Sequence, residues 1–281
     1  MASILSLRRR IRTAGNVSKT TRAMQMIAAS KLKKAQDSAV LSRPYVEKLS
    51  ALSKNLSGKI ETDNLHPYMK ENGLENTLYI IISPDKGLSG GLVSNLTREL
   101  FESTKNKNDI FITIGKKAEP GVFSLDKEVL ASFPFGTSLP PFETVYPVIK
   151  LVNDYFLNNK VGSVKIISTK FTSVFSQEPV IKEILPVKFE EKSEGTNGML
   201  FEPAIEDLLP SLLEHYIEME LYQNLLESYA SEQAARMVAM KNATDNAKEI
   251  IKELQLEYNK IRQEKITNEI LDIIGGQFAY A

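Results

Sequence analysis

The segment 83–91, Ser-Pro-Asp-Lys-Gly-Leu-Ser-Gly-Gly, has the composition of a ligand-binding loop. Its small residues stand between a predicted strand and a predicted helix, where backbone N–H groups can bind phosphate and Lys86 could assist. The spacing fits neither common phosphate-binding pattern, because Lys86 precedes the glycines and G-x-G-x-x-G is absent. We interpret the loop as a tight turn, and an α/β nucleotide-binding protein that uses Lys86 to Gly91 is the alternative function.

The other residue types that support catalysis are sparse. The chain has two histidines, His66 before Pro67 and His215 in an acidic stretch, and this placement does not indicate a triad or a metal cluster. With no cysteine, it can form neither a disulfide nor a thiolate metal site. Carboxylates after Ser211 recur at helical spacing, which is typical of a solvated helix face. We therefore expect no catalytic site, no cofactor and no metal.

Both ends of the chain predict long helices. From Ser211 to Ile274 there is neither Gly nor Pro, which indicates one helix far longer than usual. Its apolar and small residues recur at alternating steps of three and four, as in a coiled-coil seam. These residues are Leu226, Tyr229, Gln233, Met237, Met240, Thr244, Ala247, Ile251, Leu254, Tyr258 and Ile261.

The predicted partner helix runs from Ile4 to about Leu56, weakened locally by Gly15 and Pro44. Its apolar positions include Ile4, Leu7, Ile11, Ala14, Ile27, Ala35, Leu49, Leu52 and Leu56. Because the two helices flank the rest of the chain, they should pair in antiparallel fashion with the middle inserted at one end.

The middle of the chain predicts a small α/β domain. Leu78 to Ser83 and Ile110 to Gly115 are typical of buried parallel strands, and the helical stretch Leu92 to Thr104 joins them into a β-α-β unit. A further helix is predicted at about Thr144 to Asn158, and further strands at Val164 to Phe171 and Val180 to Lys188.

The predicted fold class is α/β: a long antiparallel coiled coil of N- and C-terminal helices with an inserted Rossmann-like α/β domain. The predicted domains are an N-terminal helix at 1–58, the α/β domain at 77–190 and a C-terminal helix at 204–281. The hydrophobic content of 42% and charged content of 25% fit a globular chain. No run approaches the roughly 18 apolar residues of a membrane span, and the N-terminus lacks a signal-peptide core. We expect a protein that stays inside the cell and meets membranes only through partners.

The net charge is zero, but the charges are unevenly spread. Residues 1–48 carry eleven Lys and Arg against two acidic residues, whereas Glu190 to Glu232 carries eleven acidic residues against Lys192 alone. We interpret these charges as flanking the seam and setting its pairing. A basic end that binds an acidic protein partner is a second interpretation, and nucleic acid is a third. Nucleic acid ranks last, because no aromatic residue interleaves the basic run.

The C-terminal helix should overhang its partner by about 11 residues, or roughly 16 Å. Its tip carries Ile266, Ile270, Leu271, Ile273, Ile274 and Phe278. Because such residues are rarely left in water as a patch, the overhang predicts a hydrophobic socket on another protein. Gly275-Gly276 is expected to end the helix there.

Five segments of the chain resemble a known family. Arg9 to Arg12 and Lys19 to Leu32 (KTTRAMQMIAASKL) resemble the opening helix of gamma subunits of F-type ATP synthase. Ser231 to Ala247 (SEQAARMVAMKNATDNA) and Tyr258 to Gln263 (YNKIRQ) are similar to that family's C-terminal signature. The loop from Asp85 resembles its internal motif, Asp-Arg-Gly-Leu-Cys-Gly, with Lys and Ser in place of the usual Arg and Cys. The resemblance spans the whole chain.

The resemblance implies a central rotor shaft that catalyses nothing itself and needs no cofactor. Its coiled coil would enter a hexamer of alpha and beta subunits, and its α/β domain would sit on the membrane ring of c subunits with the epsilon subunit. Ion-driven rotation would then change the beta subunits and drive ATP synthesis, or hydrolysis in reverse. It would be a peripheral protein on the cytoplasmic face of the bacterial inner membrane, held there by partners, with no nucleic acid bound.

The resemblance also implies which residues meet these partners. Arg262, Gln263 and Thr267 match positions that contact the catch loops of the beta subunits. Phe201 and Glu202 resemble the foot segment that meets the c ring.

A further set matches a region of the coiled coil linked to coupling with the beta subunits. It comprises Met24, Glu232 and Arg236. Arg236 could pair with a beta carboxylate, or it could be an ordinary charge at the edge of the seam. The bulky tail Gln277 to Ala281 departs from the Ala-rich family pattern, and we expect its removal to leave assembly intact.

Overall fold

A computed structural model of the chain describes residues 4–57, 66–104, 106, 108–188, 202 and 204–279. The chain divides into two compact units. One comprises residues Ala28–Arg236, and the other comprises Met1–Ile27 with Met237–Ala281. The larger unit contains the sheet, and both units contain parts of the two long helices.

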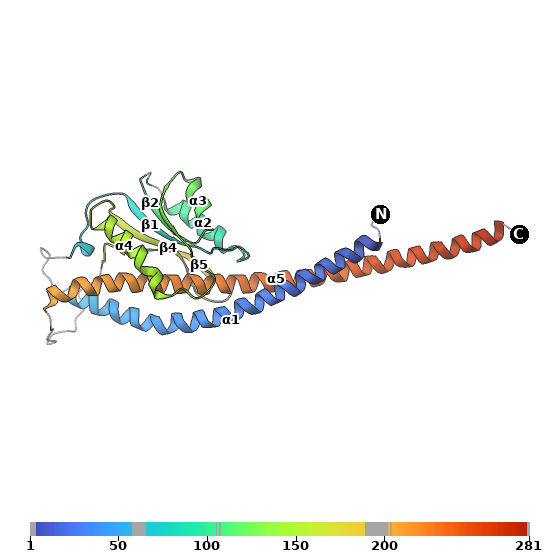
Figure 1. The fold of residues 1–281 in the computed structure, drawn as a ribbon, viewed down its shortest axis with the longest axis horizontal. Coiled ribbons are helices and arrows are strands. Elements are labelled where there is room, and N and C mark those ends of the chain that lie inside the picture. The colour runs from blue at the N-terminus through green and yellow to red at the C-terminus, as the bar shows by residue number, and fades with distance from the viewer. Residues whose placement is uncertain are drawn as a thin grey trace. The chain divides into compact units, whose positions relative to one another are not determined.

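The larger unit is built on a five-stranded sheet with the order β3-β2-β1-β4-β5 (Figure 1). The strands are β1 (Thr77–Ile82), β2 (Ile110–Ile114), β3 (Glu128–Phe133), β4 (Ser163–Phe171) and β5 (Gln177–Leu185). The first four strands are parallel, and β5 runs antiparallel to β4. At the centre, Ile80 pairs with Ile112 on one side and Ile166 on the other. The predicted Rossmann-like domain is therefore present, with strands in doubly wound order.

Helices cover both faces of this sheet. On one face, Tyr79 and Ile81 of β1 pack with Leu96 and Leu100 of α2 (Leu92–Ser103) and with Val122 of α3 (Glu119–Ser124). On the other face lie α4 (Val145–Phe156) and the C-terminal helix α5 (Ile205–Ala279), whose Asn224 Oδ1 accepts a hydrogen bond from Ser168 Oγ of β4 at 2.9 Å. Two short 3-10 helices complete the unit, η2 (Pro67–Met69) and η3 (Phe142–Thr144). Side chains that alternate along β1 therefore enter two separate cores.

The sequence analysis missed α3 and β3. The helix α3 is six residues long and contains Pro120 and Gly121, so it lacks a helical period of its own. The strand β3 is only partly buried, and its sequence EVLASF does not alternate clearly. Both elements depend on packing against β2 and α2 rather than on a strong local pattern.

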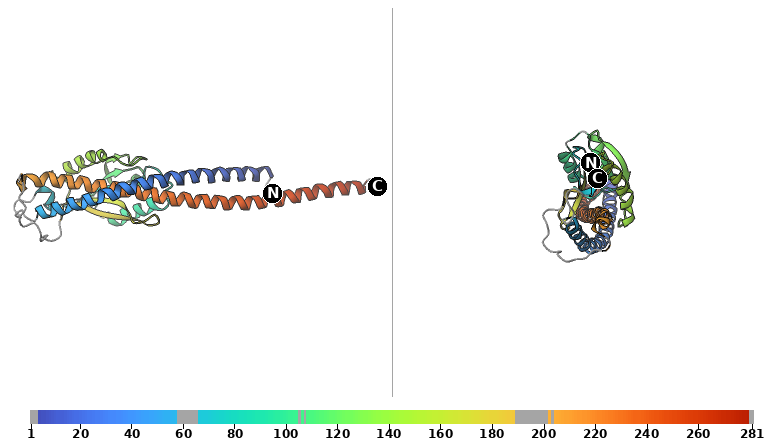
Figure 2. Two further views of the ribbon diagram at one scale, coloured as in Figure 1. Left: turned by 90° about the horizontal axis from the view of Figure 1, so that it is seen from below. Right: turned by 90° about the vertical axis from the view of Figure 1, so that its left-hand side faces the viewer.

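The two long helices run antiparallel in each unit. In the larger unit, Arg43 of α1 (Ile4–Ser57) pairs with Glu227 of α5 at 2.9 Å, and the Tyr45 hydroxyl lies 2.9 Å from His215 Nε2. The two helices lie side by side there in both views (Figure 2). In the smaller unit, Arg8 Nη2 donates to Tyr258 Oη at 2.9 Å.

The hydroxyls of Thr21 and Thr244 are also hydrogen-bonded in the smaller unit, at 2.7 Å. In both units, residues later in α1 contact residues earlier in α5, which confirms the antiparallel pairing. Neither Gly15 nor Pro44 interrupts α1.

The seam of α1 differs from the prediction at two positions. Ile27 and Leu52 are exposed, because the seam passes through their neighbours Ala28 and Ser53. The buried and half-buried positions of α1 include a series whose members follow one another at an unbroken spacing of three and four. They are Ile4, Leu7, Ile11, Ala14, Ser18, Thr21, Gln25, Ala28, Leu32, Ala35, Ala39, Ser42, Val46, Leu49, Ser53 and Leu56. The small residue Ala28 and the polar residue Ser53 thus occupy seam positions, whereas a prediction from hydrophobicity alone had placed the adjacent residues there.

On α5, all eleven predicted seam residues are buried or half-buried. The helix begins at Ile205, before Pro210, and it continues through Gly275-Gly276 to Ala279. The predicted stop at the glycines is therefore wrong. Each Gly costs a helix only about 1 kcal/mol relative to Ala, and so does not by itself force an end. No helix in the described part of the chain combines the length and the apolar character that a membrane span requires.

Candidate functional site

The turn 83–91 is hydrogen-bonded to the end of β2 and the loop that follows it. Ser83 N donates to Ile114 O at 2.8 Å, and Ser83 Oγ donates to Gly115 O at 2.9 Å. Gly115 has a φ of +93°, and a Cβ at this position would lie 1.8 Å from Ser83 O. Only glycine fits there, because any side chain would collide with Ser83 O. The glycine therefore allows the loops after β1 and β2 to meet at the carboxyl edge of the parallel strands.

Asp85 extends this contact to a third loop. Its Oδ1 accepts from Lys116 N at 3.1 Å, and its Oδ2 accepts from Gly136 N at 2.7 Å. One carboxylate therefore joins the loops that follow β1, β2 and β3. Leu88, in the same turn, has a φ of +67° and an exposed side chain.

Arg236 of α5 binds the other side of this turn. Its Nη2 donates to Lys86 O at 3.2 Å and to Gly87 O at 3.3 Å, and it pairs with Glu232 Oε1 at 2.6 Å. The turn thus offers carbonyl oxygens to a cation of its own chain. A phosphate cradle needs N–H groups instead, so this geometry favours the tight-turn interpretation.

Glu232 is the buried acid of this arrangement. Its side chain is 4% exposed, that of Arg236 is 13% exposed, and Glu232 Oε2 has no hydrogen-bond partner among the described residues. Burial raises the pKa of the Glu232 carboxyl, while the charge and hydrogen bond of Arg236 lower it. The Asp85 charge raises this pKa further, and the Lys31 charge lowers it. Burial is the largest of these influences, so the net result is a raised pKa, and Arg236 is the main group that opposes the rise.

The long helices are also tied to the segment after β3. Lys31 Nζ of α1 donates to Thr137 O, and Tyr229 Oη of α5 donates to the same oxygen at 3.2 Å. We call the group Lys31, Asp85, Thr137, Glu232 and Arg236 the helix–sheet joint. It occupies the edge where an open α/β sheet usually binds its ligand.

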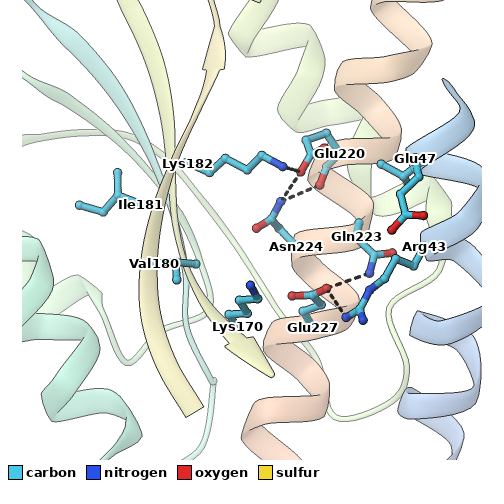
Figure 3. Close-up of a pocket in the computed structure, with 11 residues that line it drawn as sticks. Arg43, Glu47, Lys170, Val180, Ile181, Lys182, Glu220, Gln223, Asn224 and Glu227 are labelled. Atoms are coloured by element: carbon cyan, nitrogen blue, oxygen red, sulfur yellow. Dashed lines mark hydrogen bonds and ion pairs between the residues drawn. The ribbon is translucent and has the colours of Figure 1, made fainter. Parts of the chain in front are cut away.

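A cavity of about 500 Å³ lies between β4, β5 and the two long helices (Figure 3). Two ion pairs line it: Lys182 binds Glu220, and Arg43 binds Glu227 at 2.9 Å. Asn224 Nδ2 also donates to Glu220 Oε1 at 3.2 Å. The Lys182 pair joins α5 to β5, and the Arg43 pair joins α1 to α5, so both ion pairs hold elements of the fold together.

The described residues contain no group of three His, Asp or Glu side chains placed to hold a metal ion.

The predicted catch-loop residues lie on the exposed part of α5 in the smaller unit. Arg262, Gln263 and Thr267 are all exposed, and Thr267 Oγ1 donates to Gln263 O at 2.9 Å within the helix. Every residue from 262 to 271 is exposed. The predicted apolar tip is therefore uncovered where its side chains are described, at Ile266, Ile270 and Leu271.

The other predicted residues are distributed over both units. Met24 is half-buried on α1 in the smaller unit, whereas Glu232 and Arg236 belong to the larger one. Glu202 is exposed, and Phe201 lies outside the described residues.

The sequence analysis did not identify Asp85, Lys31 and Thr137 as members of the joint. Their partners are more than 25 residues away along the chain, and no local pattern reports such contacts.

Comparisons with known proteins show which family this chain belongs to. The profile of a family described as ATP synthase matches residues 3–279. The chain is 40% identical over 285 residues to a protein named ATP synthase gamma chain from Dehalococcoides mccartyi, with 100% of both chains covered. It is 36% identical over 288 residues to the protein of the same name from Legionella pneumophila, covering 99% of this chain and 100% of the relative.

Solved structures share the fold. A chain of the Euglena gracilis mitochondrial ATP synthase, in a structure titled OSCP/F1/c-ring, superposes with a TM-score of 0.73 at 22% identity, covering 98% of this chain and 94% of the other. A chain of the Tetrahymena thermophila mitochondrial ATP synthase central stalk and c ring superposes with a TM-score of 0.61 at 25% identity, covering 80% and 99%.

Proposed function

The chain belongs to the family of ATP synthase gamma chains, and we propose that it is the central rotor shaft of an F-type ATP synthase. It couples ion-driven rotation of a membrane c ring to conformational change, and so to ATP synthesis or hydrolysis, in the beta subunits. The observation that carries the proposal is the exposed helix beyond Ile261, the last residue of the seam. A helix with polar contact residues and an uncovered apolar tip is suited to insertion into another protein.

The shaft acts without a catalytic site of its own. A rotating helix pair presents different side chains to each beta subunit, and only a difference in affinity between two conformations can shift the equilibrium between them. Arg262 and Gln263 supply the contacts: a guanidinium can bind a carboxylate through two hydrogen bonds, and an amide both donates and accepts. With Thr267, these residues engage the catch loops of the beta subunits.

The apolar part of the tip provides a separate contact. Ile266, Ile270 and Leu271 are about half exposed and follow each other at steps of four and one. An apolar sleeve formed by the alpha and beta subunits would cover them, because a helix gains from burying such a patch.

The coupling role of Arg236 operates inside the chain. Its guanidinium already binds Glu232, Lys86 and Gly87, so Arg236 and Glu232 hold α5 to the sheet instead of reaching a beta carboxylate. Met24 contributes to coupling through the coiled coil.

The domains at 1–58, 77–190 and 204–281 have different roles. The two helical domains form the shaft, and the α/β domain binds the epsilon subunit and the c ring, with Phe201 and Glu202 at the foot. The protein is then a non-catalytic, peripheral component on the cytoplasmic face of a bacterial inner membrane, attached through its partners.

The test mixes the chain with alpha and beta subunits from the same organism and measures both complex size and ATP hydrolysis. We expect one copy to join a hexamer-sized complex and hydrolysis to rise only when the chain is present. Arg262→Ala or Gln263→Ala should lower the rise severalfold, whereas Arg98→Ala on the exposed surface of α2 should not.

A chain that elutes alone, with hydrolysis unchanged, contradicts the proposal. Nucleotide-dependent melting of the isolated chain would then favour the alternative, a nucleotide-binding protein that uses Lys86 to Gly91.

A further inference from the structure

The part of α5 that packs on β4 and β5 carries polar side chains where a core face is expected. Four of them follow one another at steps of four, four and three, and each is less than a tenth exposed. We call these four residues the polar row: Glu220, Asn224, Ser228 and Ser231. By contrast, α2 covers the opposite face of the sheet with leucines at steps of four, Leu92, Leu96 and Leu100. Packing a helix on this sheet therefore does not require polar residues, and burying them is unfavourable unless each finds a hydrogen-bond partner.

The first half of the polar row is bound by side chains of both strands. Lys182 of β5 forms an ion pair with Glu220 (Figure 3), and Ser168 Oγ of β4 donates to Asn224 Oδ1 at 2.9 Å. Asn224 Nδ2 donates to Glu220 Oε1 at 3.2 Å and to Glu220 O at 2.8 Å. These side chains form one connected network from β5 through α5 to β4.

The second half of the row binds the backbone of β4. The pairing of β4 with β1 extends to Ile167, and the β5 residue opposite Thr169 is Pro179, which has no N–H to donate. Ser228 Oγ accepts from Thr169 N at 3.3 Å, and Ser231 Oγ donates to Thr169 O at 3.1 Å. The helix thus supplies hydrogen-bond partners to a buried strand residue that lies past the end of the β1 pairing.

These hydrogen bonds fit one register of α5 on the sheet. A shift of α5 by one residue turns the helix by about 100° and moves it about 1.5 Å along its axis. Such a shift takes every member of the polar row away from its partner. Each buried polar group left unpaired costs roughly ten- to a hundredfold in the equilibrium constant between the two registers. Apolar packing, like that of the α2 leucines, is non-directional and penalises a shift less.

We propose that the four residues of the polar row are positioning residues that lock the rotational register of α5 on the sheet. This inference rests on the proposed function and deepens it, because torque between the α/β domain and the long helices passes through this contact. A helix with a single favourable register turns with the sheet instead of slipping against it. The surrounding apolar side chains supply stability and the polar row supplies the register, as a buried Asn does in coiled coils.

The first experiment measures the register in the free full-length chain. The chain has no cysteine, so Ser211→Cys on α5 and Glu178→Cys on β5 can carry spin labels at two exposed positions without side reactions. Rotation of α5 against the sheet swings the first label around the helix axis and changes the distance between the labels. We expect a single narrow distance distribution from the otherwise unchanged chain.

Two variants remove a polar pair from both sides of the contact and leave apolar groups in its place. They are Ser168→Ala/Asn224→Leu and Lys182→Met/Glu220→Met. Each should broaden or shift the distance distribution. Their urea midpoints should stay near that of the wild type, because replacing both partners of a buried pair by apolar groups is often neutral. The matched control, Ser94→Ala/Arg98→Leu on the exposed surface of α2, should keep the narrow distribution.

The second experiment measures coupling in the complete enzyme reconstituted into vesicles. ATP synthesis driven by a potassium diffusion potential with valinomycin should fall severalfold in both variants and stay at the wild-type level in the control. Binding of the chain to the hexamer of alpha and beta subunits should be unchanged in all three. A residue that only stabilises the fold would not lower synthesis while binding and the urea midpoint stay the same.

Several results would overturn the proposal. It fails if both variants keep the narrow distance distribution, or if the distribution broadens while ATP synthesis is unchanged. It also fails if both variants unfold at much lower urea than the wild type, because the polar row would then supply stability rather than register. A wild-type chain that never joins the hexamer refutes the proposed function, whereas the label distances in the free chain still test the register lock separately.

Discussion

Replacing Arg236 by methionine tests the helix–sheet joint. The substitution keeps a long stem but removes the cation that lies 2.6 Å from Glu232 Oε1. It leaves a carboxylate that is 4% exposed, with Oε2 already lacking a partner among the described residues. Removing one partner of a buried ion pair costs about 3–5 kcal/mol. Because Lys31 still favours the ionised carboxyl, we expect a loss near the lower end, about 3 kcal/mol.

The loss should depend on pH in a defined direction. Burial is the largest influence on the Glu232 pKa and raises it, and Arg236 opposes this rise, so the variant raises the folded-state pKa further. A carboxyl whose pKa is higher in the folded than in the unfolded state stabilises the fold below the unfolded value, and this stability is lost as pH rises through the folded value. The variant should thus be weakest at pH 7–8 and recover toward the wild type as the pH falls to about 5.

The assay is urea unfolding followed by tyrosine fluorescence, since the chain has no tryptophan. The double variant Arg236→Met/Glu232→Met should regain most of the lost stability, because replacing both members of a buried pair by apolar residues is often neutral. Arg98→Met on the exposed surface serves as the control. The reasoning is refuted if Arg236→Met lies within about 1 kcal/mol of the wild type at pH 8, or if its loss does not change with pH.

Two further predictions concern the turn and the tail. Gly115→Ala should cost more than about 2 kcal/mol in unfolding free energy, because its Cβ would meet Ser83 O at 1.8 Å. Gly91→Ala, with no heavy atom within 4 Å of its Cβ, should cost under about 1 kcal/mol in the same urea titration, and equal losses would contradict the argument. Deletion of Gln277 to Ala281 should leave the complex with alpha and beta subunits intact on a native gel, and its disappearance there would show that the tail is needed.

Sequence periodicity was sufficient to predict most elements of the fold. All eleven seam residues that the spacing of three and four predicted on α5 are buried or half-buried, and the apolar runs at β1 and β2 predicted buried parallel strands correctly. Both patterns arise within short windows, where the helical and strand repeats constrain which side chains share a face. The same reasoning placed Ile27 and Leu52 in the seam of α1. In the structure both are exposed, and their smaller neighbours Ala28 and Ser53 are buried instead.

The sequence by itself therefore determined the long paired helices, the inserted α/β domain and the family, because these depend on local period and on ordered motifs. Only the tertiary structure decided that Arg236 binds the turn at Lys86 and that Asp85 binds Gly136 N. These contacts join residues 150 and 51 positions apart, and they depend on where loops meet at a sheet edge. Backbone carbonyl and N–H groups are present at every such position, so side-chain identity alone cannot select among them.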